Sequence, residues 1–191
     1  MGVSGIIKLI LASTSPRRAA ILRQLGIPFE VVASQVEEET DGPVDRRVEK
    51  LALAKAEAVS ARREGLILGA DTLVCLHGEI LGKPRDQAEA ARMLRRISGQ
   101  VHQVLTGLAL VEGARQVCAH QLTAVEMRSL TEAEIQRYVA TGEPLDKAGA
   151  YGIQGKGAAL VKRIDGCFYN VVGLPVSLLV QQLAKFGVEV P

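Results

Sequence analysis

The chain of 191 residues is long enough for one domain or two closely joined lobes, and its 48% hydrophobic and 23% charged residues exclude a disordered tail, a collagen-like chain and a coiled coil. A net charge of +2, with three tyrosines, three phenylalanines and no tryptophan, argues against a nucleic-acid partner. The N-terminal region has neither an apolar run long enough to span a bilayer nor a signal-peptide cleavage site, so we expect no membrane partner and a cytoplasmic location. The three cysteines and three histidines are scattered, which predicts neither a disulfide framework nor a zinc site.

Strands and helices alternate in the first half of the chain. Short apolar runs predict buried strands over residues 6–12, 29–33 and 66–70, and the periodic segments between them predict helices over 16–25 and 45–63. Ser15 is the expected N-cap of the first helix, with a proline following it. The third strand is expected to end directly on Asp71.

Hairpins dominate the second half. Capping-box patterns predict helices that begin near Asp86 and Thr131, and the longer polar and apolar alternations predict paired strands over 101–111 and 116–127. A further strand is expected over 158–164, followed by a closing helix over 175–186. These elements predict an α/β protein with a mixed, twisted sheet and flanking helices, forming a single domain over residues 1–191.

A first candidate site is the segment Ser13-Thr14-Ser15-Pro16-Arg17-Arg18, which joins a buried strand to a helix N-terminus. Free backbone amides, the positive end of the helix dipole, hydroxyls and two guanidiniums together suit a phosphate. A well-capped helix with two solvated arginines is the alternative, and it stays open.

Lys55 interrupts the apolar stripe of the helix over 45–63. At ~100° per residue it lies in the middle of the face formed by its apolar neighbours. Burying an ammonium group is costly unless an anion compensates for it, so this lysine either extends past the core edge or reaches into a charged cleft. Charged residues at the strand ends favour the cleft.

Asp71 follows a buried strand, and ligands of open α/β sheets bind at the carboxyl ends of strands. It is a candidate metal ligand or general base, with a turn or capping aspartate as the alternative. The acidic run over 37–39 could supply one oxygen ligand to Mg²⁺, although such runs are usually solvated loops. Lys83, on a Gly-Lys-Pro turn, is either a second phosphate contact or an ordinary surface lysine.

Residues 149–157 (GAYGIQGKG) are rich in glycine but do not form a P-loop. Ala150 stands where the first glycine is required, and Gly157 replaces the Ser or Thr that would hold Mg²⁺. What remains is a loop that can approach a flat ligand closely, with a Gln154 amide able to pair with the edge of a base. Cations, one or two carboxylates and an amide, without a Ser-His or Cys-His pair, suit metal-assisted attack of water on a phosphate ester or anhydride.

Five ordered blocks of sequence resemble the Maf family of nucleoside triphosphate pyrophosphatases. They are LILASTSPRR over 9–18, GADTLV over 69–74, GKPRD over 82–86, EPLDKAGAYGIQG over 143–155 and VVGLP over 171–175. The resemblance implies two lobes around a central cleft. It also implies hydrolysis of a nucleoside triphosphate to the monophosphate and pyrophosphate with a divalent cation, Mg²⁺ or Mn²⁺.

The resemblance also implies roles for individual residues. Asp71 would accept the proton of the attacking water and, with Glu38, hold the metal, while the triphosphate would be bound by Ser13, Arg18, Lys55 and Lys83. Three further positions, occupied by Arg17, Thr72 and Gln154, match the branch that acts on dTTP and UTP, rather than the 7-methyl-GTP branch, which has Trp, Gln and Glu there. Modified pyrimidine nucleotides are additional candidate substrates.

A nucleotide-binding regulator of cell division and septum formation, without essential catalysis, is the alternative function. The presence of Asp71, Lys55 and Lys83 argues against it, because a sensor needs no carboxylate that activates water. Proteins of this family are often dimers, which makes a homodimer an expectation here.

Overall fold

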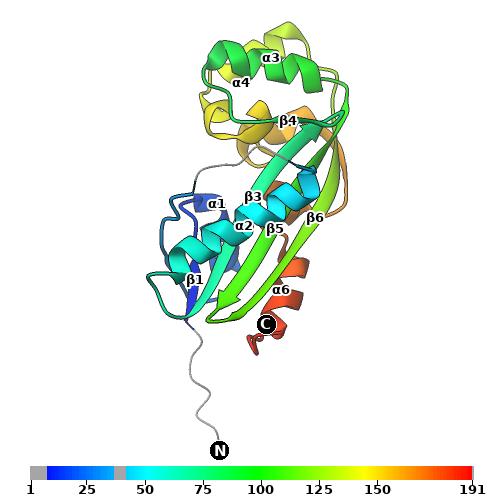
Figure 1. Cartoon of the computed structure of the whole chain (residues 1–191). Coiled ribbons are helices and arrows are strands. Elements are labelled where there is room, and N and C mark those ends of the chain that lie inside the picture. The colour runs from blue at the N-terminus through cyan, green and yellow to red at the C-terminus, as the bar shows by residue number, and fades with distance from the viewer. Residues whose placement is uncertain (1–7, 37–41, 191) are drawn as a thin grey trace, which may run out of the picture. The chain divides into compact units, whose positions relative to one another are not determined.

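The computed structural model describes residues 8–36 and 42–190, which form a mixed α/β fold (Figure 1). Its strands are β1 (Leu9–Leu11), β2 (Phe29–Val31), β3 (Leu66–Leu76), β4 (Glu79–Leu81), β5 (Val101–Glu112), β6 (Arg115–Met127) and β7 (Val161–Asp165). The helices are α1 (Pro16–Gln24), α2 (Val44–Ser60), α3 (Gln87–Ile97), α4 (Glu132–Val139), α5 (Phe168–Val172) and α6 (Val176–Ala184), with short 3₁₀ turns η1 (Glu143–Asp146), η2 (Ala148–Ala150) and η3 (Gly155–Leu160). None of the helices in the described ranges is long and apolar enough to cross a bilayer.

The strands form one sheet in the order β2-β1-β3-β5-β6-β7, and β4 pairs with β3. β1 is parallel to β2 and to β3, whereas β4 is antiparallel to β3 and β7 is antiparallel to β6. The expected mixed sheet with flanking helices is therefore confirmed.

The predicted end of the third strand is wrong. β3 does not stop at residue 70 but continues through Asp71 to Leu76, because the residues after the aspartate (TLVCL) are again apolar or β-branched. Its parallel neighbour β1 is the strand that ends early, opposite Leu68. Asp71 therefore lies inside a strand, just past the end of a shorter neighbouring strand.

Other differences concern short elements. The strand expected over 158–164 begins only at Val161, because residues 155–160 form η3. β4 and α5 were not expected, since elements of three and five residues carry too little periodicity to be recognised. The capping box at Thr131 is confirmed: its hydroxyl accepts the Glu134 amide at 3.3 Å, and the Glu134 carboxylate accepts the Thr131 amide at 2.8 Å.

The chain divides into two compact units, and β3, β5 and β6 contribute residues to both. The first unit comprises Met1–Asp71, Gly107–His120 and Gly173–Pro191. In it, α2 crosses the face of β3 and β5 (Figure 1) at unusually close range. A Cβ at Gly69 would come 2.1 Å from the Ala52 carbonyl oxygen, and one at Gly107 would come 2.4 Å from the Val48 carbonyl oxygen. The two glycines thus bring the backbone of α2 directly onto the strands.

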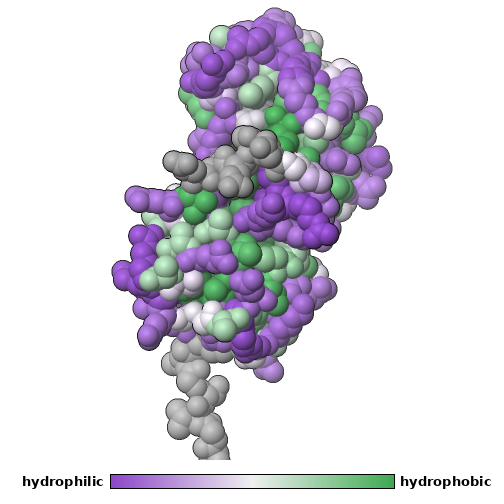
Figure 2. Space-filling model, in the orientation of Figure 1, coloured by the Kyte–Doolittle hydropathy of each residue, from purple (hydrophilic) through white to green (hydrophobic). Residues whose placement is uncertain are grey.

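The second unit comprises Thr72–Thr106 and Gln121–Val172. Its core is formed by residues of α3 and α4 packed with strand residues such as Val74, Val104 and Val125. α3 buries its apolar stripe and exposes its arginines, so its outer surface is hydrophilic (Figure 2).

Candidate functional site

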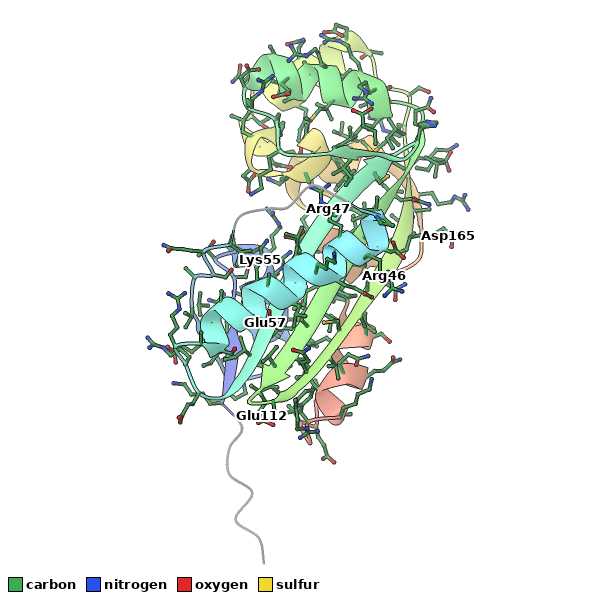
Figure 3. All side chains as sticks on the ribbon, in the orientation of Figure 1. Arg46, Arg47, Lys55, Glu57, Glu112 and Asp165 are labelled. Atoms are coloured by element: carbon green, nitrogen blue, oxygen red, sulfur yellow. The ribbon has the colours of Figure 1, made fainter. Side chains whose placement is uncertain are left out.

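Lys55 of α2 and Asp71 of β3 form a largely buried ion pair. The Lys55 ammonium donates a hydrogen bond to Oδ1 of Asp71, and the two side chains are only 16% and 8% exposed. Figure 3 labels Lys55 on the middle of α2, the part of the helix that Gly69 allows to approach β3. The lysine that interrupts the apolar stripe is therefore accounted for by a carboxylate partner.

Arg18, in the first turn of α1, lies close to this pair. Its Nε donates to the Gly173 carbonyl oxygen at 2.8 Å, and Nη1 donates to the Ser13 hydroxyl at 3.1 Å. Burial lowers the pKa of the Arg18 guanidinium, and the negative charge of Asp71 acts in the opposite direction. The positive charge of the neighbouring Arg17 lowers the Arg18 pKa further.

The N-terminus of α1 lies where the sequence predicts it, with Ser15 at the N-cap position, but the Ser15 side chain makes no capping hydrogen bond. Instead, the Ser13 hydroxyl accepts the Ser15 amide at 3.2 Å as well as the Arg18 guanidinium. The hydroxyl is thereby held at the start of the helix, where backbone amides and the helix dipole favour an anion.

The first unit consequently gathers two cationic side chains and a hydroxyl around one carboxylate, from Arg18, Lys55, Ser13 and Asp71, with Arg17 adjacent to Arg18. The excess of positive charge suits a polyanion such as a phosphate chain. The carboxylate is the group in this set that can act as a base toward water.

Thr72, the residue after Asp71, belongs to the second unit and is held by a buried polar network. Its hydroxyl lies 3.0 Å from the hydroxyl of Thr106. The Thr106 amide donates to Oδ1 of Asn170 at 3.1 Å, and the Thr106 hydroxyl donates to the Asn170 carbonyl oxygen at 2.8 Å. Asn170 is 0% exposed, and its Nδ2 donates to the Val104 carbonyl oxygen at 3.0 Å. Thr72 is thus fixed by groups that are themselves fully satisfied.

Lys83 and Gln154 are exposed residues of the second unit and lie in different loops. Lys83 lies between β4 and α3, where it lines a surface pocket together with Arg85, Arg92 and Arg96. Gln154 lies on the loop that leads into η3. Glu38, the remaining predicted residue, lies outside the described residues.

The described donor set fits a divalent cation held jointly with a substrate. Within residues 8–36 and 42–190, no three side chains of His, Cys, Asp or Glu come together as a metal site. Mg²⁺ is usually bound through one or two carboxylates plus substrate phosphates, and Asp71 supplies one such carboxylate.

Sequence reasoning missed Thr106 and Asn170, which hold Thr72, and Tyr138 and Glu143, which bind backbone amides of the glycine-rich loop. Asn170 is the only asparagine of the chain, but its partners lie far away along the sequence, so no local pattern pointed to its role. Glu143 stands in one of the blocks that resemble the Maf family, but two of its partners are backbone amides, which carry no signal in the sequence.

Comparison with known proteins agrees with the fold and with the sequence blocks. Residues 8–186 match the family model for Maf-like proteins, and the chain belongs to this family. The dTTP/UTP pyrophosphatase of Symbiobacterium thermophilum is 56% identical over 184 residues, which cover 94% of each chain. The dTTP/UTP pyrophosphatase of Moorella thermoacetica is 54% identical over 188 residues, covering 96% of this chain and 97% of the relative.

Among solved structures, the Ham1 protein of Staphylococcus aureus superposes with a TM-score of 0.57 over 95% of this chain and 100% of its own. Its sequence identity is 13%, so the likeness concerns the fold. The resemblance inferred from the five sequence blocks is confirmed by the family match.

Proposed function

We propose that this chain is a pyrophosphatase that hydrolyses dTTP and UTP to the monophosphate and pyrophosphate, with a divalent cation, Mg²⁺ or Mn²⁺. The observation that carries the proposal is the buried Lys55–Asp71 pair with Arg18 beside it. It is supported by the relatives named dTTP/UTP pyrophosphatase, which align over nearly the whole chain at more than half identity.

Asp71 is the proposed general base. Lys55 binds its Oδ1, and Oδ2 has no hydrogen-bond partner among the residues that the structure describes. The ammonium group orients the carboxylate and offsets its charge, while Oδ2 can accept a proton from a water molecule. That water then attacks the α-phosphorus, and pyrophosphate departs as the bond from the α-phosphorus to the bridging oxygen breaks.

The cations of the first unit bind the phosphate chain. Arg18 and the Ser13 hydroxyl lie at the N-terminus of α1, where backbone amides add further donors. Charge-assisted hydrogen bonds from these groups stabilise the negative charge that moves onto the leaving pyrophosphate. Lys83 is proposed as a further phosphate-binding residue.

Asp71 and Glu38 are the proposed protein ligands of the divalent cation. When bound, the cation neutralises phosphate charge and makes the phosphorus more susceptible to attack.

Base recognition is assigned to Arg17, Thr72 and Gln154. An amide can donate to O4 and accept from N3–H of uracil or thymine, which matches Gln154. Thr72 is held by the Thr106 and Asn170 network, so a hydroxyl is presented at a fixed position.

The test is pyrophosphate release from dTTP, UTP, CTP, GTP and ATP with Mg²⁺ or Mn²⁺, in water enriched in ¹⁸O. We expect release from dTTP and UTP, with the label in the monophosphate. Label in the pyrophosphate would contradict attack at the α-phosphorus, and stronger release from the purine nucleotides would contradict the assigned base recognition.

A further inference from the structure

A single carboxylate, that of Glu143, holds the glycine-rich loop around Gln154. Its Oε2 accepts the Lys156 amide at 3.0 Å, and its Oε1 accepts the Gly157 amide at 2.9 Å. Oε1 also accepts the Tyr138 hydroxyl at 2.9 Å. One side chain of η1 thereby satisfies two successive amides at the start of η3.

The other side of Gln154 is held by Tyr138. Its hydroxyl accepts the Gly152 amide at 3.2 Å while donating to Glu143. Hydrogen bonds therefore flank Gln154 two residues before it and two and three residues after it. We call Glu143 and Tyr138, with the amides of residues 152, 156 and 157, the loop clasp.

The fit of the loop against the clasp is close. Gly155, next to Gln154, has φ +65°, and a Cβ there would come 2.9 Å from Oε2 of Glu143. A Cβ at Gly157 would come 2.6 Å from the Tyr138 hydroxyl. Glycine at these positions is what lets the loop backbone reach both side chains.

Glu143 acts in the clasp as an anion. Burial opposes its charge, but hydrogen bonds from the Gly157 and Lys156 amides and the Tyr138 hydroxyl outweigh burial, so the pKa of the Glu143 carboxyl is lowered. Bonds from amides to a charged acceptor are stronger than bonds between neutral groups. A loop with glycines at 152, 155 and 157 would otherwise have many conformations to lose on binding a ligand.

We propose that Glu143 and Tyr138 are positioning residues for substrate selection, which hold the loop so that the exposed Gln154 amide is ready to pair with a pyrimidine base. This proposal rests on the proposed function. It adds that base selection also depends on residues that do not touch the base. Neither clasp residue contacts the substrate in this scheme. Their effect on activity passes through Gln154, because ordering the loop in advance lowers the cost of binding the base.

The test is a double-mutant cycle on kcat/KM for UTP, with the wild type, Glu143→Gln, Gln154→Ala and the double variant. The neutral amide of glutamine cannot accept both loop amides as the carboxylate does, so we expect Glu143→Gln to lower kcat/KM roughly ten- to a hundredfold, mainly through KM. In the Gln154→Ala background the same substitution is expected to have almost no further effect. Faster hydrogen exchange at the Lys156 and Gly157 amides in Glu143→Gln should accompany the loss.

Two further variants keep the test decisive. Glu30→Gln makes the same chemical change in the first unit, where Glu30 forms an exposed ion pair with Lys8, and should leave kcat/KM unchanged. Tyr138→Phe keeps the ring and removes only the hydroxyl, so it can replace Glu143→Gln in the cycle if that variant does not fold. It should give a smaller loss that also disappears in the Gln154→Ala background.

The outcomes separate this inference from the proposed function. If the wild type is active and the losses in kcat/KM from Glu143→Gln and Gln154→Ala multiply in the double variant, the positioning role alone is overturned. A Gln154→Ala variant with wild-type kcat/KM has the same meaning. A wild type that releases no pyrophosphate from UTP or dTTP overturns the proposed function, and the role in base selection with it.

Discussion

Replacing Lys55 with methionine removes the ammonium group that pairs with Asp71 and keeps much of the apolar stem. The remaining carboxylate side chain is 8% exposed, so water can replace little of the lost interaction. Removing one partner of a buried ion pair usually costs about 3–5 kcal/mol, whereas an exposed pair contributes about 0–1 kcal/mol. Arg18 still lies near Asp71 and compensates for part of its charge. We therefore expect Lys55→Met to lower the free energy of unfolding by about 2–3 kcal/mol.

Urea unfolding at pH 7, followed by circular dichroism, measures this loss. Asp71→Asn and the double variant complete a cycle, in which the pair should show a coupling of about 2 kcal/mol. Lys8→Met is the matched control, because Lys8 pairs with Glu30 at 2.6 Å but their side chains are 63% and 37% exposed. A cost for Lys55→Met no greater than that of Lys8→Met, or no measurable coupling, would refute the argument that burial makes this pair strong.

Two other predictions concern stability. The His102 side chain is 1% exposed, and burial lowers its pKa to about 4, so the unfolded chain takes up a proton first as the pH falls. The free energy of unfolding should therefore decrease between pH 6.5 and 4, and His102 should contribute up to about 3 kcal/mol to the decrease. Urea titrations over this pH range should show a shallower decrease for His102→Gln than for the wild type. The same pH dependence in the two proteins would contradict the assignment to His102. Gly69→Ala places a methyl group against the Ala52 carbonyl oxygen, and it should lower the free energy of unfolding by about 3 kcal/mol or more as α2 moves off the strand. Gly82→Ala, where a Cβ meets nothing within 4 Å, should change it by less than about 1 kcal/mol, and equal costs at the two positions would show that the close approach of α2 does not matter.

Much of the fold follows from local patterns in the sequence. The long helices and the paired strands β5 and β6 were predicted because each carries enough periodic residues to define its type. The end of β3 was wrong because one polar residue inside an apolar run looks like a strand end. Asp71 lies just beyond the end of the neighbouring strand β1, and the sequence of β3 does not indicate where β1 ends.

The candidate site was predictable to a similar extent. Lys55 stood out because a charge in an apolar stripe needs an explanation, and the structure supplies Asp71 as its partner. The roles of Glu143 and Asn170 were not predictable from patterns. Glu143 binds amides 13 and 14 residues further along the chain, and Asn170 binds groups more than 60 residues away, so both depend on the completed fold.

The most direct test of the proposed chemistry is pyrophosphate release from UTP by Asp71→Asn beside the wild type, with UTP binding measured on the same samples. Asp86→Asn is the matched control, since Asp86 caps α3 through the Glu89 amide. We expect the Asp71 variant to lose roughly 10²–10⁴ in turnover with UTP binding largely retained, and the Asp86 variant to keep its turnover. Wild-type turnover in Asp71→Asn would contradict the role of this carboxylate. A wild type that binds UTP but releases no pyrophosphate would contradict catalysis itself and favour a nucleotide-binding regulator.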